Sequence, residues 1–185
     1  MKTNPDMLYL PYRLKEVNRR GTVGNRWESA AEHNYSSMML ASYYIRFYPD
    51  LNFERVMKII LFHDLVEIFA GDTFILDDEA LKLKYKRETM AFEKLLCELP
   101  LEFAGELKVL WPEYLYGQTK EARFVKAIDS LDPMIHSIYK PEEWTRYNFT
   151  EKKLRQKKEK YFSEFKELKE MFEQILVRLK ASGAI

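Results

Sequence analysis

The sequence predicts an all-α protein, folded as a compact bundle of helices in a single domain. Apolar residues recur every three or four positions over most of the 185 residues, which is the period of a helix that buries one face. Glycine and proline are scarce, at 6 and 7 residues, and stand mostly between the periodic segments. No internal repeat or low-complexity linker divides the chain, so we expect one domain over residues 1–185.

Three helices are expected in the first part of the chain. The first covers residues 7–19 and is followed by a loop at 21–25 that is rich in turn formers. The second begins near Ser29, where Ser29-Ala30-Ala31-Glu32 has the spacing of a capping box, and runs to about residue 48. The third covers residues 52–70 and ends at a glycine.

Prolines divide the helices expected in the middle of the chain. One helix covers residues 78–98, and the next, at 101–110, is interrupted by Pro112. Another begins after residue 119, and Pro133 is expected to kink it or to end it near residue 131.

A long C-terminal helix is expected over residues 150–180. Its apolar positions follow a spacing of 4-3-4-3-4. This stripe favours packing against the core of the same chain, with a helix of a partner subunit as the alternative.

The composition excludes several classes of protein. Lys and Arg number 30 against 29 Asp and Glu, so the net charge of +1 gives no electrostatic footprint for a nucleic-acid polymer. The single Cys97 excludes an internal disulfide framework and a cysteine-rich zinc site, and fits a reducing cytoplasm. No apolar run is long enough to span a membrane, and the first residues lack a signal-peptide core. We therefore expect a cytoplasmic protein with no membrane partner.

The adjacent pair His63-Asp64 indicates a metal site. It lies in an otherwise apolar, helix-periodic run at residues 56–67. On spacing alone, a hydrogen-bonded structural histidine is an equally good interpretation. Burial favours the metal, because an unpaired buried carboxylate is costly and a cation bound by Asp64 and His63 removes that cost.

Two further residues complete a set of four ligands. His33 and Asp129 lie on two other expected helices, and facing helices of a bundle can direct such side chains to one point. Two His and two Asp suit one divalent ion, such as Mn, Co, Fe, Ni, Zn or Mg. Such an ion lowers the pKa of a bound water and so supplies a nucleophile for hydrolysis.

Other polar residues are suited to proton transfer or to binding a phosphate group. Glu67, one turn after His63, is placed to handle protons. Asp72 is a second acidic candidate, with a turn or cap residue as the alternative. Arg19, Arg20 and Arg26 flank the loop before the second helix, and arginine binds phosphate through a bidentate fork. Loop arginines are otherwise solvated.

Trp27 and His136 are left with open roles. Trp27 borders the expected pocket, where it either packs or stacks on a base. His136, beyond Pro133, is interpreted as a core or surface histidine in preference to a ligand.

The pattern His33, His63-Asp64 and Asp129 resembles the H…HD…D signature of the HD-domain phosphohydrolases. Residues 28–33, 63–67, 71–72 and 124–129 are similar to one branch, the HD-domain 5′-deoxynucleotidases, which hydrolyse deoxynucleoside monophosphates. The resemblance covers about residues 12–140 and does not include the last helix. It implies an all-α HD-domain bundle, commonly a homodimer.

The resemblance also implies roles for single residues. His33, His63, Asp64 and Asp129 would hold the metal. Glu67 and Asp72 would be catalytic, the first positioning the attacking water and the second lying near the phosphate and sugar. Arg19 would bind the substrate phosphate.

The chain departs from this branch after Arg19. Relatives often carry a tryptophan there that excludes the ribose 2′-hydroxyl, whereas this chain has Arg20 and Gly21. A ribonucleotide or another small phosphate ester is therefore an alternative substrate. A non-catalytic nucleotide-binding HD module is a further alternative, disfavoured because the ligand residues and Glu67 are all present.

Overall fold

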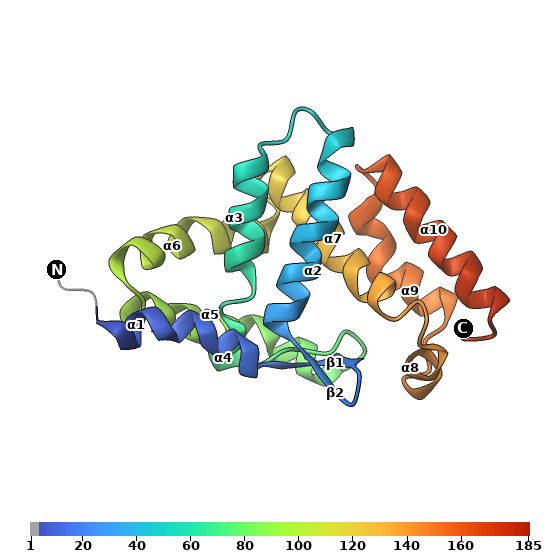
Figure 1. The fold of residues 1–185 in the computed structure, drawn as a ribbon, viewed down its shortest axis with the longest axis horizontal. Coiled ribbons are helices and arrows are strands. Elements are labelled where there is room, and N and C mark those ends of the chain that lie inside the picture. The colour runs from blue at the N-terminus through green and yellow to red at the C-terminus, as the bar shows by residue number, and fades with distance from the viewer. Residues whose placement is uncertain (1–3) are drawn as a thin grey trace.

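Helices make up most of residues 4–185, the part of the chain that the computed structural model describes (Figure 1). The predicted all-α fold is confirmed, and the only sheet among these residues is a two-stranded hairpin. The α-helices are α1 Pro5–Tyr9, α2 Ala30–Tyr44, α3 Phe53–His63, α4 Glu67–Ala70, α5 Asp78–Glu98, α6 Leu101–Tyr116, α7 Lys120–His136, α8 Pro141–Arg146, α9 Glu151–Lys158 and α10 Lys166–Ala181. Within the same residues, no helix is both long and apolar enough to cross a lipid bilayer.

Helices α2, α3 and α7 pack against one another at the centre of the molecule (Figure 1). Their facing sides bury large apolar side chains completely, among them Ile59, Ile60, Phe124 and Ile128. Burial of such side chains is the main source of stability in a domain of this kind. A polar side chain on these faces is therefore held away from water and needs a partner.

The β hairpin corrects the sequence prediction. The first helix was expected to reach residue 19, but α1 is followed by a 3-10 helix that ends at Glu16. Strands β1, Asn18–Val23, and β2, Arg26–Ser29, then pair antiparallel around Gly24, whose φ of 58° suits the turn.

Contacts from the far end of the chain hold this hairpin. Glu143 of α8 accepts hydrogen bonds from the backbone N–H and the hydroxyl of Thr22, at 2.9 and 2.5 Å. A tertiary contact of this kind is invisible to local sequence patterns, which explains why the strands were missed.

The third predicted helix ends earlier than expected. It was expected to run unbroken over residues 52–70, but α3 ends at His63 and α4 begins only at Glu67. Asp64 caps the end of α3, and its carbonyl accepts a hydrogen bond from the Glu67 N–H at 2.9 Å. Gly71, with a φ of 73°, then ends α4. A turn at residues 64–66 therefore separates His63 from Glu67.

The helix interruption predicted at Pro112 was wrong, and so was the alternative that the next helix ends near residue 131; the kink expected at Pro133 stays a prediction. Helix α6 continues past Pro112, and α7 continues past Pro133 to His136. A proline in a helix costs about 3 kcal/mol or more. The neighbours Trp111 and Met134 are buried, and burying such side chains contributes about 1.5–3 kcal/mol each. Packing therefore offsets the lost hydrogen bonds.

The predicted C-terminal helix is divided. In place of one helix over residues 150–180, the structure has α9, a 3-10 helix at Glu159–Phe162, and α10. Helix α10 packs against α7, and Leu168, Phe172 and Ile175 of its stripe are buried within this chain. These residues of the stripe thus pack on the core of their own chain.

Candidate metal and phosphate site

The predicted metal residues come together between α2, α3 and α7. His33 of α2, His63 at the end of α3 and Asp64 each offer one ligand atom, and these atoms lie within 4.8 Å of one another. Asp129 of α7 joins them, because its Oδ1 lies 3.0 Å from His33 Nε2. Three helices that are far apart in sequence thus place nitrogen and oxygen donors at one point.

The tautomer of His63 is set by the end of α3. Its Nδ1 lies 2.8 Å from the carbonyl of Ile60, and a carbonyl only accepts, so Nδ1 carries the proton and Nε2 a free lone pair. Within the part of the chain that the structure describes, that Nε2 is buried without a hydrogen bond, and so is Oδ2 of Asp64. Two adjacent buried acceptors without donors fit a bound cation, which would satisfy both.

Asp132 orients His33, a role that sequence reasoning did not assign. Its Oδ2 lies 2.8 Å from His33 Nδ1, which directs Nε2 toward Asp129 and Asp64. A carboxylate behind a metal-binding imidazole is a common arrangement in metal sites. The available signal was its spacing, because Asp132 lies one turn after Asp129 on the same helix.

The charges around His33 favour a cation at Nε2. Burial and the charge of Arg19 act to lower the pKa of His33, but its bonds to Asp129 and Asp132 outweigh them and raise it to about 10. Burial acts to raise the pKa of Asp129, yet His33 holds it well below the usual range. Asp129 also accepts a hydrogen bond from the Tyr114 hydroxyl at 2.7 Å. A bound divalent ion would replace the proton that His33 and Asp129 share.

Glu67 lies beside this group and is buried. The residue is 4% exposed, and its Oε2 has no hydrogen-bond partner among residues 4–185. Burial raises the pKa of Glu67 well above its usual range, and the charge of Asp64 acts in the same direction. A carboxyl group of raised pKa can hold or accept a proton near neutral pH.

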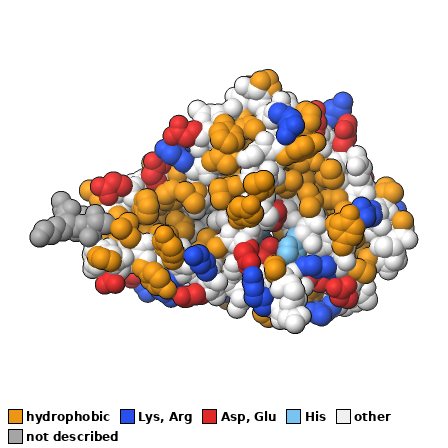
Figure 2. Space-filling view, in the orientation of Figure 1, with side chains coloured by type: hydrophobic (Ala, Val, Ile, Leu, Met, Phe, Trp, Pro, Cys, Tyr) orange, Lys and Arg blue, Asp and Glu red, His pale blue; other side chains and the backbone are white. Residues whose placement is uncertain are grey.

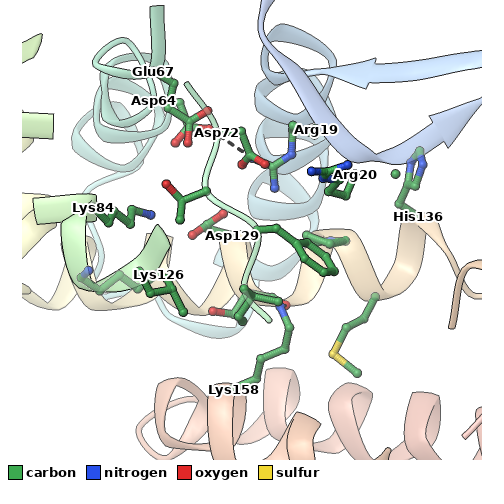
Figure 3. A pocket seen from close by; sticks show the side chains of 18 of the residues that line it. Arg19, Arg20, Asp64, Glu67, Asp72, Lys84, Lys126, Asp129, His136 and Lys158 are labelled. Atoms are coloured by element: carbon green, nitrogen blue, oxygen red, sulfur yellow. Dashed lines mark hydrogen bonds and ion pairs between the residues drawn. The ribbon is translucent and has the colours of Figure 1, made fainter. Parts of the chain in front are cut away.

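Arg19 on β1 supplies a cation next to these carboxylates (Figure 3). Its Nη1 lies 3.5 Å from Oδ1 of Asp72 and 3.8 Å from Oδ2 of Asp64. Burial acts to lower the pKa of Arg19, but Asp72 and Asp64 outweigh it, so the guanidinium stays charged. Burial in turn raises the pKa of Asp72. The predicted Arg19 and Asp72 are thus both part of the site.

Glu28 on β2 holds Arg19 from behind and is a second residue that sequence reasoning missed. It is 3% exposed, and its carboxylate lies 3.5 Å from Nε of Arg19 and 3.2 Å from Nδ1 of His136. His136 also contacts the Thr22 carbonyl at 3.0 Å. His136 therefore supports the hairpin and lies outside the convergent metal donors, as the sequence indicated.

A cavity of about 480 Å³ opens onto these residues, within the range of roughly 300–1,000 Å³ that ligand pockets occupy. Phe74 and Tyr147 contribute aromatic rings to its wall. Trp27 does not line it, so the prediction that Trp27 borders the pocket was wrong. The Trp27 side chain stands opposite Thr22 on the hairpin and is 38% exposed.

Comparison with known proteins defines the class of this fold and site. Residues 12–169 match the HD domain family. The chain belongs to the HD domain family.

Among its relatives, the chain is 32% identical to the 5′-deoxynucleotidase HDDC2 of Homo sapiens, over 70% of this chain and 64% of that protein. It is 33% identical to the 5′-deoxynucleotidase hdd1 of Schizosaccharomyces pombe, over 70% of this chain and 68% of that protein. The chain thus spans just under two thirds of the length of the human relative.

A solved structure is similar over nearly the whole chain. It is described as a predicted metal-dependent phosphohydrolase from Magnetospirillum magnetotacticum, with a TM-score of 0.86 and 29% identity. The match covers 97% of this chain and 94% of that one. Together with the family match, this likeness implies a divalent metal in the site.

Proposed function

We propose that this protein is a metal-dependent phosphohydrolase that releases phosphate from (deoxy)nucleoside 5′-monophosphates. The observation that supports this best is a pair of buried acceptors, His63 Nε2 and Asp64 Oδ2, that have no hydrogen bond among the described residues and lie beside Arg19 in an open cavity. The 5′-deoxynucleotidase relatives support the same substrate class.

The metal would be a single divalent ion held by His33, His63, Asp64 and Asp129. These nitrogen and oxygen donors accept several first-row ions. When bound, the ion supplies positive charge that lowers the pKa of a water molecule and stabilises charge on phosphate oxygens. Asp132 would keep His33 in the tautomer that leaves Nε2 free, as the 2.8 Å contact suggests.

Three side chains would act on the substrate and the water. Arg19 binds two oxygens of the phosphate through its fork, with Asp72 fixing the orientation of the guanidinium. Glu67 orients the attacking water and accepts its proton, because a buried carboxylate of raised pKa is a suitable general base. The water oxygen bonds to phosphorus, the P–O5′ bond breaks, and the O5′ leaves with a proton as the nucleoside hydroxyl.

The test is phosphate release from matched deoxy- and ribonucleoside 5′-monophosphates. The protein is treated with a chelator and then given Mn, Co, Ni, Zn or Mg one at a time. Release that is lost on chelation and restored by one of these ions is expected. Equal release from both sugars is the expected consequence of Arg20 and Gly21 standing where relatives carry a tryptophan. Metal binding without release from any nucleotide would contradict the nucleotidase proposal.

A second copy of the chain is the proposed protein partner. Tyr35, Met39, Tyr43 and Phe47 lie four residues apart along one side of α2 and the turn after it, each 45% to 64% exposed. Figure 2 shows that apolar side chains cover much of this face of the molecule. An exposed apolar stripe of this kind is typical of a subunit interface.

The mass in solution tests the dimer. We expect sedimentation to give twice the chain mass for the native protein and a monomer for Met39→Glu. The control is Met90→Glu, because Met90 is a similarly exposed methionine, at 63%, on α5. A native monomer would contradict this proposal. We further propose a reducing cytoplasm as the location, which the exposed free thiol of Cys97 supports.

A further inference from the structure

Three lysines line the cavity on the side away from Arg19 (Figure 3). Lys84 comes from α5, Lys126 from α7, and Lys158 from the end of α9. In Figure 3, Asp129 lies between Arg19 and these lysines. The proposed nucleotidase mechanism assigns none of them a role.

Two of these lysines have no carboxylate partner among the described residues. Lys158 is 6% exposed, and its Nζ donates a hydrogen bond to the backbone carbonyl of Ser130 at 2.8 Å. Lys126 is half-buried, and its Nζ lies 4.3 Å from the centre of the Tyr114 ring. Only Lys84 forms an ion pair, with Glu88 at 3.4 Å.

Unpaired buried ammonium groups are costly, so they indicate a counter-ion that comes from outside the chain. Burial lowers the pKa of Lys126, and it lowers the pKa of Lys158 to about 8. By contrast, Arg19 on the other side of the cavity lies within 4 Å of carboxylates on Asp64, Asp72 and Glu28. The acidic residues balance Lys84, because burial acts to lower its pKa but the charges of Glu88 and Glu67 outweigh burial and raise the pKa to about 12. They do not balance the other two lysines, because burial lowers the pKa of Lys126 and of Lys158 and outweighs Asp129, which acts to raise both.

On the basis of the proposed function, we propose that Lys84, Lys126 and Lys158 form a second phosphate subsite for a substrate that carries two separate phosphates. A nucleoside 3′,5′-bisphosphate is the nucleotide of this chemical class. Its 5′-phosphate would lie at Arg19 and the metal residues, and its 3′-phosphate, across the sugar, would reach the lysines. Water attacks the 5′-phosphorus and the P–O5′ bond breaks, while the 3′-phosphate keeps its ester bond and leaves with the product.

Separate phosphates fit the cavity better than adjacent ones. The lysines and Arg19 lie on different sides of Asp129 (Figure 3), whereas the two phosphates of a nucleoside diphosphate share one bridging oxygen. A diphosphate would therefore place both groups near Arg19 and leave the lysines unpaired.

The test compares kcat/KM for a deoxynucleoside 5′-monophosphate, its 3′,5′-bisphosphate and its 5′-diphosphate, with the full chain loaded with metal. The variants are Lys126→Gln and Lys158→Met. The matched control is Lys86→Gln, because Lys86 is exposed on α5 outside the cavity. We expect the native protein to prefer the bisphosphate about tenfold over the monophosphate, the size of one charge-assisted contact. Each cavity variant should remove most of that preference, and the control should keep it.

Three outcomes would overturn the proposal. They are no preference for the bisphosphate in the native protein, a preference that survives both cavity variants, and a stronger preference for the diphosphate.

If no nucleotide is hydrolysed, the proposed function fails, and calorimetric binding of the same compounds to the metal-loaded protein then decides on the subsite. Tighter binding of the bisphosphate that is lost in Lys126→Gln supports it, and equal binding of monophosphate and bisphosphate overturns it.

Discussion

The two sides of the cavity differ in whether their buried charged groups have oppositely charged partners. On the metal side, His33 and Arg19 each have an opposite charge close by, as in the 3.0 Å contact of His33 with Asp129 and the 3.5 Å contact of Arg19 with Asp72. On the lysine side, and among residues 4–185, the ammonium groups of Lys126 and Lys158 meet a ring and a carbonyl instead of a carboxylate. Paired groups are held in place before a ligand arrives, whereas unpaired groups cost stability until one does. The paired groups on the metal side are thus fixed before a substrate binds. The unpaired lysines on the other side are the groups for which we propose a second phosphate.

The largest loss of metal binding and activity is expected from removing Asp64, whose carboxylate lies near both histidines and Arg19. We expect Asp64→Asn to lose the metal and to lower kcat/KM by at least about 1,000-fold, since the ion supplies several kcal/mol of charge stabilisation. Metal content by mass spectrometry and phosphate release measure both. Asp50→Asn is the control, because Asp50 forms only an exposed ion pair with Lys120. Full metal occupancy in Asp64→Asn would refute Asp64 as a ligand.

Glu67→Gln separates proton handling from metal binding on the same side. The amide keeps the size of the buried side chain but cannot accept a proton at neutral pH. We therefore expect kcat to fall by about 100- to 10,000-fold, the usual contribution of a general base, while the metal content and the melting temperature stay close to native. Stopped assays alongside metal analysis provide the measurement. Activity at the native level would show that Glu67 is not the base.

Glu28→Gln tests whether the pairing of Arg19 matters for the substrate phosphate. Glu28 contacts Arg19 and His136 and has no role in holding the metal, so it is a positioning residue. We expect KM to rise about tenfold, the cost of disturbing one charge-assisted hydrogen bond, with a smaller change in kcat. A fall in kcat at constant KM would contradict this role. Glu143→Gln offers a comparison, because Glu143 supports the hairpin through Thr22 without contacting Arg19.

The sequence could identify the residues whose own type and position are unusual. His33, His63 and Asp64 were found because histidine is rare in this chain, at 3 residues, and because polar residues in helix-periodic apolar runs need a reason to be there. Arg19 was one of three loop arginines that the sequence offered, and only a resemblance singled it out from Arg20 and Arg26, since its strand has no clear periodic pattern.

Residues that act through another side chain were missed. Asp132 orients His33 across 99 positions of sequence and Glu28 contacts His136 from another element. The spacing of Asp132 from Asp129 places both on one side of α7, but no local pattern shows which distant side chain either residue contacts. The hairpin was missed for the same reason, because Glu143 holds Thr22 from 121 residues away. The helix interruption expected at Pro112 and the possible helix end near residue 131 did not occur, because packing overrode a local rule.

The smallest expected effect concerns the stability of the lysine side, and Lys158→Met measures it. The lowering of the Lys158 pKa from 10.5 to about 8 corresponds to about 3 kcal/mol. Losing the Ser130 hydrogen bond offsets about 1 kcal/mol of the gain. We therefore expect the melting temperature to rise by roughly 4–8 °C at pH 7.

The pH dependence of this gain identifies its cause. Below pH 8 the lysine is charged in both the folded and unfolded states, so the folded protein bears the full cost of burying the charge. Between pH 8 and 10.5 the unfolded chain holds a proton that the folded one has released, so native stability rises with pH. The stabilisation by Lys158→Met should thus be largest near pH 7 and should shrink toward pH 10.5.

Comparison with the native protein and with a surface variant isolates the contribution of Lys158 to this pH dependence. Asp129 and Asp132 act to raise the Lys158 pKa and Arg19 acts to lower it, and all three are present in both proteins, so the difference between them isolates Lys158. The exposed Lys152→Met on the same helix should show no such pH dependence. A destabilised Lys158→Met at pH 7 would mean that Lys158 serves the fold by bonding to Ser130, and the contrast between the two sides of the cavity would then disappear.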